Sequence, residues 1–208
     1  MAIHISGVRN TEADGLSRRH RDHSYSLPDS LFSFFCEAFD FSPSVDLFAS
    51  RVNFKLPNYY SAGPDPFANN FDAFLCSWPD KVYAFPPINL VDQFLLRFLN
   101  LQIPLGILVC PFWPSQPYYP TLLGVLIDVP FLISASRLVD SDLLPSSLSQ
   151  ILVCFISSNC ALQKAYQRTL QHAFSDRYTP RPSVHTFEAG SYFQIGVLNN
   201  KCIMAICQ

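Results

Sequence analysis

The sequence has 208 residues, of which 49% are hydrophobic and only 14% are charged, and its formal net charge is −2. This composition supports a sizeable core, excludes wholesale disorder, and leaves room for one full domain plus a fragment. It also argues against a free-standing nucleic-acid binder, because phosphate neutralisation by basic residues supplies much of the affinity of such proteins.

The numbers of proline and cysteine residues narrow the class of protein further. The 17 prolines against 7 glycines predict many short elements rather than a helical bundle. The seven cysteines form an odd number without a C-x-x-C pair, which is typical of reduced, buried thiols in an intracellular protein of the nucleus or cytoplasm. The start lacks an apolar signal core, and the apolar run 122–133 is too short to span a membrane. We therefore expect a soluble protein without a membrane partner.

In chain order, the first predicted element is a helix. Asn10 can cap a helix that runs to about Arg19, with acidic residues early and arginines late, as the helix dipole favours. Residues 23–30 are expected to be a linker. The segment 31–39 is a short, mostly buried helix that starts at Asp29 or Ser30.

The central segment alternates strands and helices. The apolar runs 44–50, 81–88 and 105–112 predict buried strands, the second broken by prolines, and 89–101 has the apolar period of a helix. The run 121–127 is either a helix or a strand. Continuous apolar strands separated by helices predict an α/β fold with a parallel or mostly parallel sheet that contains all three strands.

The region after residue 145 has a different pattern. The segments 148–159 and 161–174 are predicted to be helical, and 177–187 is predicted to be a linker. The expected organisation is therefore a helical segment 1–22, a linker 23–30, an α/β domain 31–144, and a helical or irregular tail 145–208.

The most specific motif lies near the start. His4, Gly7, Asn10 and Asp14 have the spacing H-x2-G-x2-N-x3-D, followed by Leu-Ser-Arg. This segment resembles the C-terminal end of ribonuclease H domains in retroelement reverse transcriptases. The resemblance implies that Asp14 is the fourth carboxylate of a two-magnesium site and that His4 assists proton transfer or product release. The alternative is that Asn10 caps a helix with Asp14 in its first turn.

The other three carboxylates of such a nuclease site lie upstream of this motif in the resembled domains. One carboxylate of four does not hold two magnesium ions, which bind hard oxygen ligands. We expect magnesium only in an intact ribonuclease H domain, and no nuclease activity from this chain alone.

A second resemblance covers about half the chain. Its parts are VDLFASRVNFKLPNYYS at 45–61, Trp78, YAFPPINLVDQFLLRF at 83–98, and GILVCPFWPSQPYYP at 106–120. In this order they resemble the domain that follows ribonuclease H in DIRS-type and related gypsy-like retroelement polyproteins. That domain is similar to phage-type DNA adenine methyltransferases, so the resemblance implies a Rossmann-like methyltransferase fold.

The same resemblance implies two functional loops. A loop after the first strand would cradle S-adenosylmethionine with Asp46, Phe48, Ala49, Ser50 and Asn53. The catalytic loop reads Asn/Asp-Pro-Pro-aromatic in that family, and here it is Phe85, Pro86, Pro87 and Ile88.

The catalytic loop departs from the family at both chemical positions. Phe85 has no acceptor for the exocyclic amine of adenine, and Ile88 has no ring face to stack on a flipped base. We therefore expect no methyl transfer, no cofactor requirement in isolation, and weak or absent binding of S-adenosylmethionine. Asp46 could equally be a carboxylate that stabilises a turn at the end of a strand.

Four aromatic residues gather in a proline-rich loop, namely Phe112, Trp113, Tyr118 and Tyr119. They predict either a loop packed on the core or a platform on which single-stranded nucleic acid stacks.

Three functions remain in view. The first is an inactive fragment of a retroelement polyprotein, whose parent binds an RNA–DNA hybrid or DNA. The second is an S-adenosylmethionine-dependent DNA adenine methyltransferase. The third is a domesticated module that binds a protein partner, which a large exposed apolar patch would favour.

Overall fold

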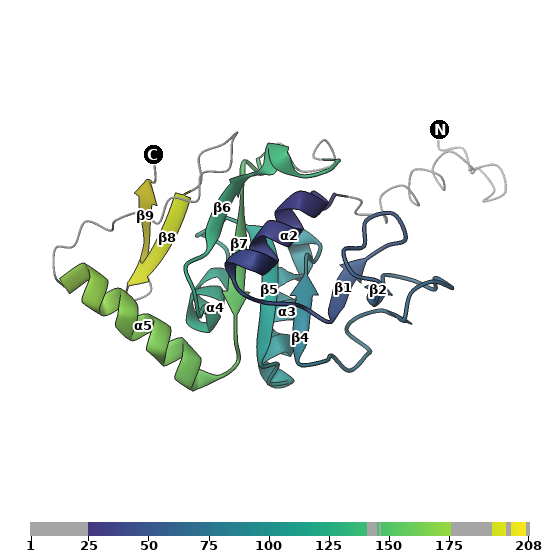
Figure 1. Cartoon of the computed structure of the whole chain (residues 1–208), viewed down its shortest axis with the longest axis horizontal. Helices are drawn as coiled ribbons and strands as arrows, with labels where there is room; N and C mark the ends of the chain where they lie inside the picture. Colours follow the sequence, from purple (N-terminus) through teal and green to yellow (C-terminus); the bar gives the residue numbers. More distant parts are fainter. Residues whose placement is uncertain (1–24, 141–144, 146, 176–192, 199–200, 207–208) are drawn as a thin grey trace, which may run out of the picture.

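A single mixed sheet with helices on both faces organises the chain (Figure 1). The computed structural model describes residues 25–140, 145, 147–175, 193–198 and 201–206. The nine strands lie in the order β3-β2-β1-β4-β5-β7-β6-β8-β9. Their bounds are β1 Val45–Ala49, β2 Tyr59–Ser61, β3 Asn70–Phe71, β4 Lys81–Ala84, β5 Leu105–Pro111, β6 Phe131–Ser134, β7 Gln150–Ile156, β8 Phe193–Leu198 and β9 Lys201–Ile206.

The first five strands form the parallel part of the sheet. β1 pairs with β2 and β4, β2 pairs with β3, and β4 pairs with β5, all in parallel. Strands β1, β4 and β5 are almost fully buried, as continuous apolar runs require when both faces of a sheet are covered. The segments 44–49, 81–85 and 105–110 were predicted to share a mostly parallel sheet. This prediction is confirmed, because they form β1, β4 and β5, and the part of the sheet that β1–β7 make is mostly parallel.

Four helices cover the sheet in the described part of the chain. Their bounds are α2 Asp29–Ala38, α3 Val91–Asn100, α4 Tyr118–Val125 and α5 Cys160–Ser175. The core residues of α2 pack with Tyr83, Ile107 and Val109 on one face, whereas those of α3, α4 and α5 pack with Val82 and Leu108 on the other. Figure 1 shows α2 in front of the sheet and α3 behind it. The helices expected at 31–39 and 89–101 are confirmed, and 121–127 is helical up to Val125.

Strand β7 corrects one expectation. Residues 148–159 were predicted to be helical, but Gln150–Ile156 form a strand that pairs antiparallel with both β5 and β6. A short apolar run that is buried on all sides has no period that separates strand from helix. The sheet therefore crosses the domain end expected at residue 144. The tail is not simply helical or irregular, because it supplies α5 as predicted and also β7, β8 and β9.

The expected linker also differs from the structure where the structure describes it. Tyr25 and Leu27 are buried, and Ser26 exchanges backbone hydrogen bonds with Val139. Alternating apolar residues thus pack this segment against the sheet before α2 begins at Asp29. The predicted ribonuclease H remnant at 1–22, with its capped helix, lies outside the described residues. So does the whole of the linker predicted at 177–187.

Two further observations concern the described residues. None of their helices is both long enough and apolar enough to cross a membrane. Among the described cysteines, Cys110 and Cys154 are buried as expected, whereas Cys160 is exposed.

Candidate ligand-binding cavities

A cavity of about 620 Å³ opens where the parallel strands end. Strands β1 and β4 are neighbours, but the chain passes from β1 to β2 and β3 on one side before it returns to β4 on the other. This is a topological switch point, where open α/β sheets bind ligands. The cavity is lined by Leu47, Phe48, Ala49, Ser50, Arg51, Val52, Ser61, Ala62, Gly63, Pro64, Asp65, Asp72, Ala73, Phe74, Pro87 and Leu90. We call it the switch-point cavity.

The loop after β1 brings three predicted cofactor residues to this cavity. Phe48, Ala49 and Ser50 line it, whereas Asn53 does not. The side-chain oxygen of Asn53 accepts hydrogen bonds from the backbone N–H of Ser50 at 2.7 Å and from its hydroxyl at 2.9 Å. Asn53 therefore holds the turn that presents Ser50, as asparagine commonly does in tight turns.

Asp46 lies behind the cavity wall and is not part of its lining. Its carboxylate is buried and accepts hydrogen bonds from the backbone N–H groups of Lys55 at 3.0 Å and Phe48 at 3.4 Å. Burial raises the pKa of Asp46 to about 7, and these hydrogen bonds and the nearby Lys55 charge offset part of that rise. The structure thus places Asp46 where it ties the β1 loop together.

Two residues that line the switch-point cavity, Arg51 and Asp65, form an ion pair. Arg51 Nη2 lies 2.7 Å from Asp65 Oδ1, and the Arg51 guanidinium lies 4.4 Å from the centre of the Phe67 ring. Asp65 also accepts hydrogen bonds from the Tyr59 hydroxyl and the Phe67 backbone. The hydrogen bond from Arg51 is the main reason why the pKa of Asp65 falls to about 2.

Two polar residues end the neighbouring short strands. The Ser61 hydroxyl donates to the Gly63 carbonyl at 2.6 Å, and Asp72 Oδ1 accepts from the Phe74 N–H at 3.0 Å. Asp72 has a left-handed backbone with φ of 53°, and its N–H donates to the Ser61 carbonyl. Among the described residues, the second carboxylate oxygen of Asp72 has no hydrogen-bond donor, so it is available to a ligand.

Sequence reasoning missed Arg51, Ser61, Asp65 and Asp72. β2 has only three residues and β3 only two, too few to show a strand pattern. The feature of the sequence that could have identified these residues is the polar residue that follows each short hydrophobic group. Such residues are expected at the carboxyl edge of a parallel sheet.

The predicted catalytic loop is divided by the structure. Phe85 is buried and packs edge-to-face on Tyr25 with ring centres 5.2 Å apart, and Pro86 is buried beside it. Pro87 lines the switch-point cavity together with Ser50. Ile88 instead faces a second cavity on the other side of the loop.

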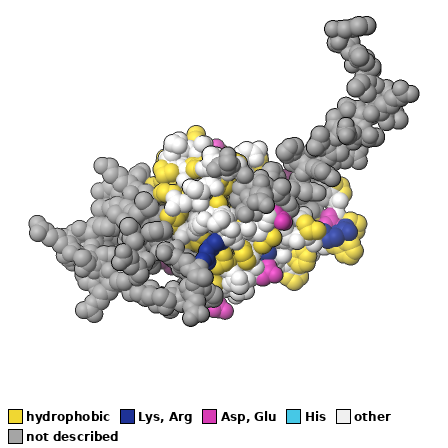
Figure 2. Space-filling view, turned by 90° about the horizontal axis from the view of Figure 1, so that it is seen from above, with side chains coloured by type: hydrophobic (Ala, Val, Ile, Leu, Met, Phe, Trp, Pro, Cys, Tyr) yellow, Lys and Arg dark blue, Asp and Glu magenta, His cyan; other side chains and the backbone are white. Residues whose placement is uncertain are grey.

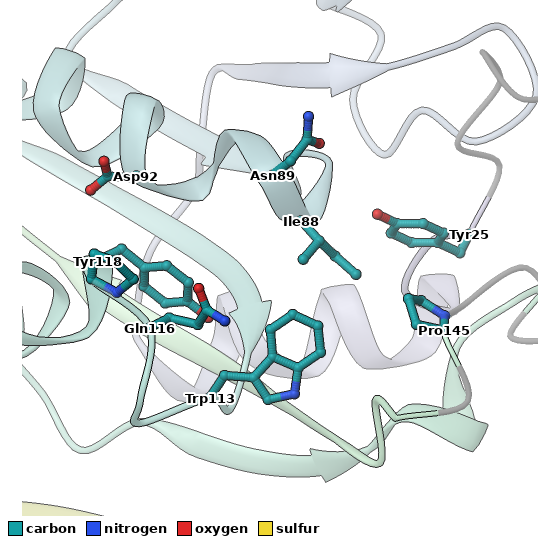
Figure 3. A pocket seen from close by; sticks show the side chains of 9 residues that line it. Tyr25, Ile88, Asn89, Asp92, Trp113, Gln116, Tyr118 and Pro145 are labelled. Atoms are coloured by element: carbon teal, nitrogen blue, oxygen red, sulfur yellow. The ribbon is translucent and has the colours of Figure 1, made fainter.

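The second cavity has a volume of about 470 Å³ and lies beyond the ends of β4 and β5 (Figure 3). We call it the Trp113 cavity. Its lining consists of Tyr25, Ile88, Asn89, Asp92, Trp113, Gln116, Pro117, Tyr118 and Pro145.

The aromatic loop was interpreted either as packed on the core or as a stacking platform, and the structure assigns its residues differently. Tyr118 and Tyr119 are buried, and the Tyr118 hydroxyl donates to the Pro111 carbonyl at 2.9 Å, so these residues belong to the core. Trp113 is only half-buried and its ring lies at the cavity (Figure 3). Core packing therefore describes the tyrosines, whereas Trp113 remains accessible to a ligand.

Figure 2 shows no continuous row of basic side chains among the described residues visible on this face. Figure 2 looks down from the side toward which β4 points in Figure 1, and shows hydrophobic patches with few charged side chains among the described residues. Those residues also contain no group of three or more His, Cys, Asp or Glu side chains that could hold a metal ion. His4 and Asp14 lie outside the described part of the chain. No protein-family model matches the sequence, and a search of curated proteins found no match.

Proposed function

We propose that this chain is a retroelement-derived, methyltransferase-like domain that binds an adenosine-type ligand in the switch-point cavity without transferring a methyl group. The observation that carries the proposal is the position of this cavity at the ends of β1, β2, β3 and β4. Strands β1–β6 follow the order 3-2-1-4-5-6 of doubly wound nucleotide-binding folds, with the reversed strand β7 inserted before β6. This order supports a Rossmann-like origin.

The residues of the cavity fit S-adenosylmethionine in size and charge. A volume of about 620 Å³ lies within the usual range of ligand sites. The lining contains two carboxylates, Asp65 and Asp72, and one cation, Arg51, so one negative charge is left over for a sulfonium or ammonium group. When bound, S-adenosylmethionine would carry the activated methyl group. Ser61 and Asp72 would be the groups that recognise the ligand.

The loop after β4 argues against transfer of that group. Phe85 is held in the core against Tyr25, where it offers neither an acceptor nor an accessible ring. Losing one well-placed polar group at such a site typically costs about 10²–10³ in rate. The aliphatic Ile88 also gives up the stacking that would retain a flipped base. These two substitutions support binding without catalysis.

A protein-binding role is a second candidate, supported by exposed apolar residues near the sheet edge. Phe67, Phe71 and Leu75 are 68%, 52% and 78% exposed around β3, which pairs only with β2 among the described strands. Exposed apolar groups at a strand edge favour contact with another chain. Loss of a co-purifying partner on Phe67→Ser would support this role.

Calorimetric titration with S-adenosylmethionine and S-adenosylhomocysteine tests the proposed function. We expect saturable binding that Asp72→Asn weakens, because the asparagine keeps the hydrogen bond to Phe74 but loses the charge. Asp80→Asn is the matched control, since Asp80 is exposed and outside the cavity. Equal binding by both variants, or no binding by the native chain, would contradict the proposal.

A second assay separates binding from catalysis. With methyl-labelled S-adenosylmethionine and adenine-containing DNA, we expect no incorporation above a protein-free reaction. Incorporation that disappears in Asp72→Asn would instead establish an active methyltransferase.

A further inference from the structure

The Trp113 cavity lies on the other side of the turn η2 (Ile88–Leu90) from the switch-point cavity. Ile88 and Asn89 face the Trp113 cavity, whereas Pro87 and Leu90 face the switch-point cavity. A turn with three residues per repeat sends neighbouring side chains in different directions, so one short segment contributes to two sites. The two cavities have no lining residue in common, so each can bind a ligand of its own.

The two ends of the Trp113 cavity differ in chemistry. Figure 3 shows Trp113, Ile88 and Tyr25 toward one end of the cavity. It shows Asp92 toward the opposite end, above Tyr118. A ligand that contacts both ends therefore needs an apolar part and a polar part that are separated along its length.

Asp92 is the only charged side chain among the described residues that line this cavity. The lining contains no Lys, Arg or His, and burial raises the pKa of Tyr25 and of Tyr118, so both are neutral phenols around neutral pH. Asp92 is exposed, and no described side chain forms an ion pair with it. A carboxylate without a counter-ion repels an anionic ligand and attracts a cation.

Two neutral side chains add hydrogen-bond acceptors to the lining. Asn89 and Gln116 are exposed, and neither side chain makes a hydrogen bond with another described residue. Each carries an amide oxygen that accepts hydrogen bonds, and an ammonium group has three N–H donors to offer. The cavity therefore suits a cation that is also a hydrogen-bond donor.

We propose that the Trp113 cavity binds a primary arylalkylamine, with its aromatic ring against Trp113 and its ammonium group at Asp92. The ring packs on the indole as offset or edge-to-face aromatic pairs do. The ammonium donates a charge-assisted hydrogen bond to the carboxylate. An uncharged aromatic ligand leaves Asp92 without a partner, and an aliphatic amine leaves the indole without a ring. The proposal does not depend on a ligand in the switch-point cavity.

Asp92 also has a structural role that the experiment must separate from binding. It lies in the first turn of α3, where a carboxylate stabilises a helix through the helix dipole. Asp92→Asn can therefore lower stability without any effect of a ligand. The preference for a charged over an uncharged ligand is the quantity to measure, because helix stability alone does not change it.

Calorimetry with phenethylamine and 2-phenylethanol measures this preference, since the two ligands differ only in an ammonium or a hydroxyl group. We expect the native chain to bind the amine on the order of 10-fold more tightly, the range for one charge-assisted hydrogen bond. Asp92→Asn should abolish the preference. Asp80→Asn, an exposed carboxylate outside the cavity, is the matched control and should keep it. Equal affinities in the native chain, or a preference that survives in Asp92→Asn, would overturn the proposal.

Tryptophan fluorescence tests the contact with the ring, because the chain has only two tryptophans. Trp78 is buried, and its indole N–H donates to the Ala73 carbonyl at 2.7 Å, so it is shielded from a ligand in the cavity. We expect phenethylamine to change the emission saturably in the native chain and not in Trp113→Leu. A change that persists in Trp113→Leu would contradict the proposed contact, as would no change in the native chain.

A saturated ligand tests whether the ring must be aromatic. The compound 2-cyclohexylethylamine keeps the ammonium and the chain length of phenethylamine but has no π-system. We expect the native chain to bind it more weakly, and Trp113→Leu to bind both amines alike. Equal binding of the two amines by the native chain would overturn the role of Trp113.

The location and the source of the amine are assigned with one further variant and one further ligand. A preference for the amine that is lost in Asp72→Asn but kept in Asp92→Asn would place the ligand in the switch-point cavity and overturn the proposal. Phenylalaninamide carries the same ring and ammonium beside a peptide-like carbonyl group. Tighter binding than phenethylamine assigns the site to the N-terminus of a peptide, and weaker binding assigns it to a free amine; both support amine recognition. Far-ultraviolet circular dichroism and thermal midpoints confirm that each variant is folded.

Discussion

Asp46 on β1 and Tyr83 on β4 are register partners, and both are buried on the face of the sheet that α2 covers. Burial raises the pKa of each, and the Asp46 carboxylate raises the pKa of Tyr83 further. The Tyr83 hydroxyl has no hydrogen-bond partner among the described residues. A buried carboxyl beside a buried phenol favours the neutral form of both.

This pair predicts how stability depends on pH. The pKa of Asp46 is raised from 3.8 to about 7, so between these values the folded chain binds a proton that the unfolded chain does not. The contribution of Asp46 is therefore complete below about pH 4 and is lost as the pH rises to about 7. Asp46→Asn removes the titration and keeps an oxygen acceptor for the Lys55 N–H. We expect the native chain to lose more stability than this variant between pH 5 and pH 8, measured by urea unfolding.

Comparing the two proteins cancels the titration of the histidines, which both chains contain. The low pKa of Asp65 has the opposite sign and affects stability only below about pH 4, outside this interval. Parallel stability curves for the native chain and Asp46→Asn from pH 5 to pH 8 would show that Asp46 is not buried as described.

Gly106 is expected to tolerate no side chain. A Cβ atom at this position would lie 2.9 Å from Val82 Cγ2 and 3.1 Å from Phe98 Cε2, which belong to β4 and α3. We expect Gly106→Ala to lower the free energy of unfolding by about 1–3 kcal/mol through overpacking. Gly124 in α4 is the matched control, because a Cβ atom there meets nothing within 4 Å. Gly124→Ala should be neutral or stabilising by up to about 1 kcal/mol.

The two glycine variants are compared by denaturant unfolding under identical conditions. Equal midpoints for Gly106→Ala and the native chain would mean that α3 sits farther from β4 and β5 than described here.

Phe94 anchors α3 to the sheet. It is fully buried, stacks on Trp78 with ring centres 5.3 Å apart, and also contacts Phe48 beside the switch-point cavity. We expect Phe94→Ala to destabilise the fold by about 3–5 kcal/mol. Leu96 lies on the same helix but is 52% exposed, so Leu96→Ala should change stability by no more than about 0.5 kcal/mol. Similar thermal midpoints for both variants would contradict this packing.

The ribonuclease H resemblance is tested with an RNA–DNA hybrid and magnesium. We expect no cleavage above a protein-free control, because Asp14 is one carboxylate where the two-magnesium site uses four. Cleavage by the native chain that Asp14→Asn abolishes would contradict this expectation and would reveal further carboxylate ligands in the chain.

Strands β1, β4 and β5 of the parallel part of the sheet were predictable, whereas the short strands β2 and β3 were not. Runs such as Leu105–Pro111 are continuously apolar, and the helix between β4 and β5 has a regular apolar period. β7 was not predictable from periodicity, since its run is equally apolar but its location between β5 and β6 depends on the whole sheet. The packing of Tyr25 and Leu27 was missed because Pro28 and the polar neighbours suggest a linker.

The switch-point cavity was predictable only in part. The loop after β1 was named as a binding loop because the family resemblance and the predicted strand before it agreed on its position. Phe48, Ala49 and Ser50 of this loop line the cavity. Asp65 and Asp72 follow strands too short to recognise. The geometry of the turn η2 sets the direction of each side chain around it. The sequence alone therefore could not predict that Pro87 and Ile88 face different cavities.

The place of β7 constrains how the chain assembles. β6 is synthesised before β7, but β6 cannot join the strands β1–β5 until β7 has paired with β5. Until residues 150–156 arrive, the outer edge of β5 exposes unpaired backbone groups along an apolar strand, which is a template for intermolecular pairing. A chain that stalls at this stage is therefore prone to aggregate, and a chaperone that shields the β5 edge should raise the yield of folded protein.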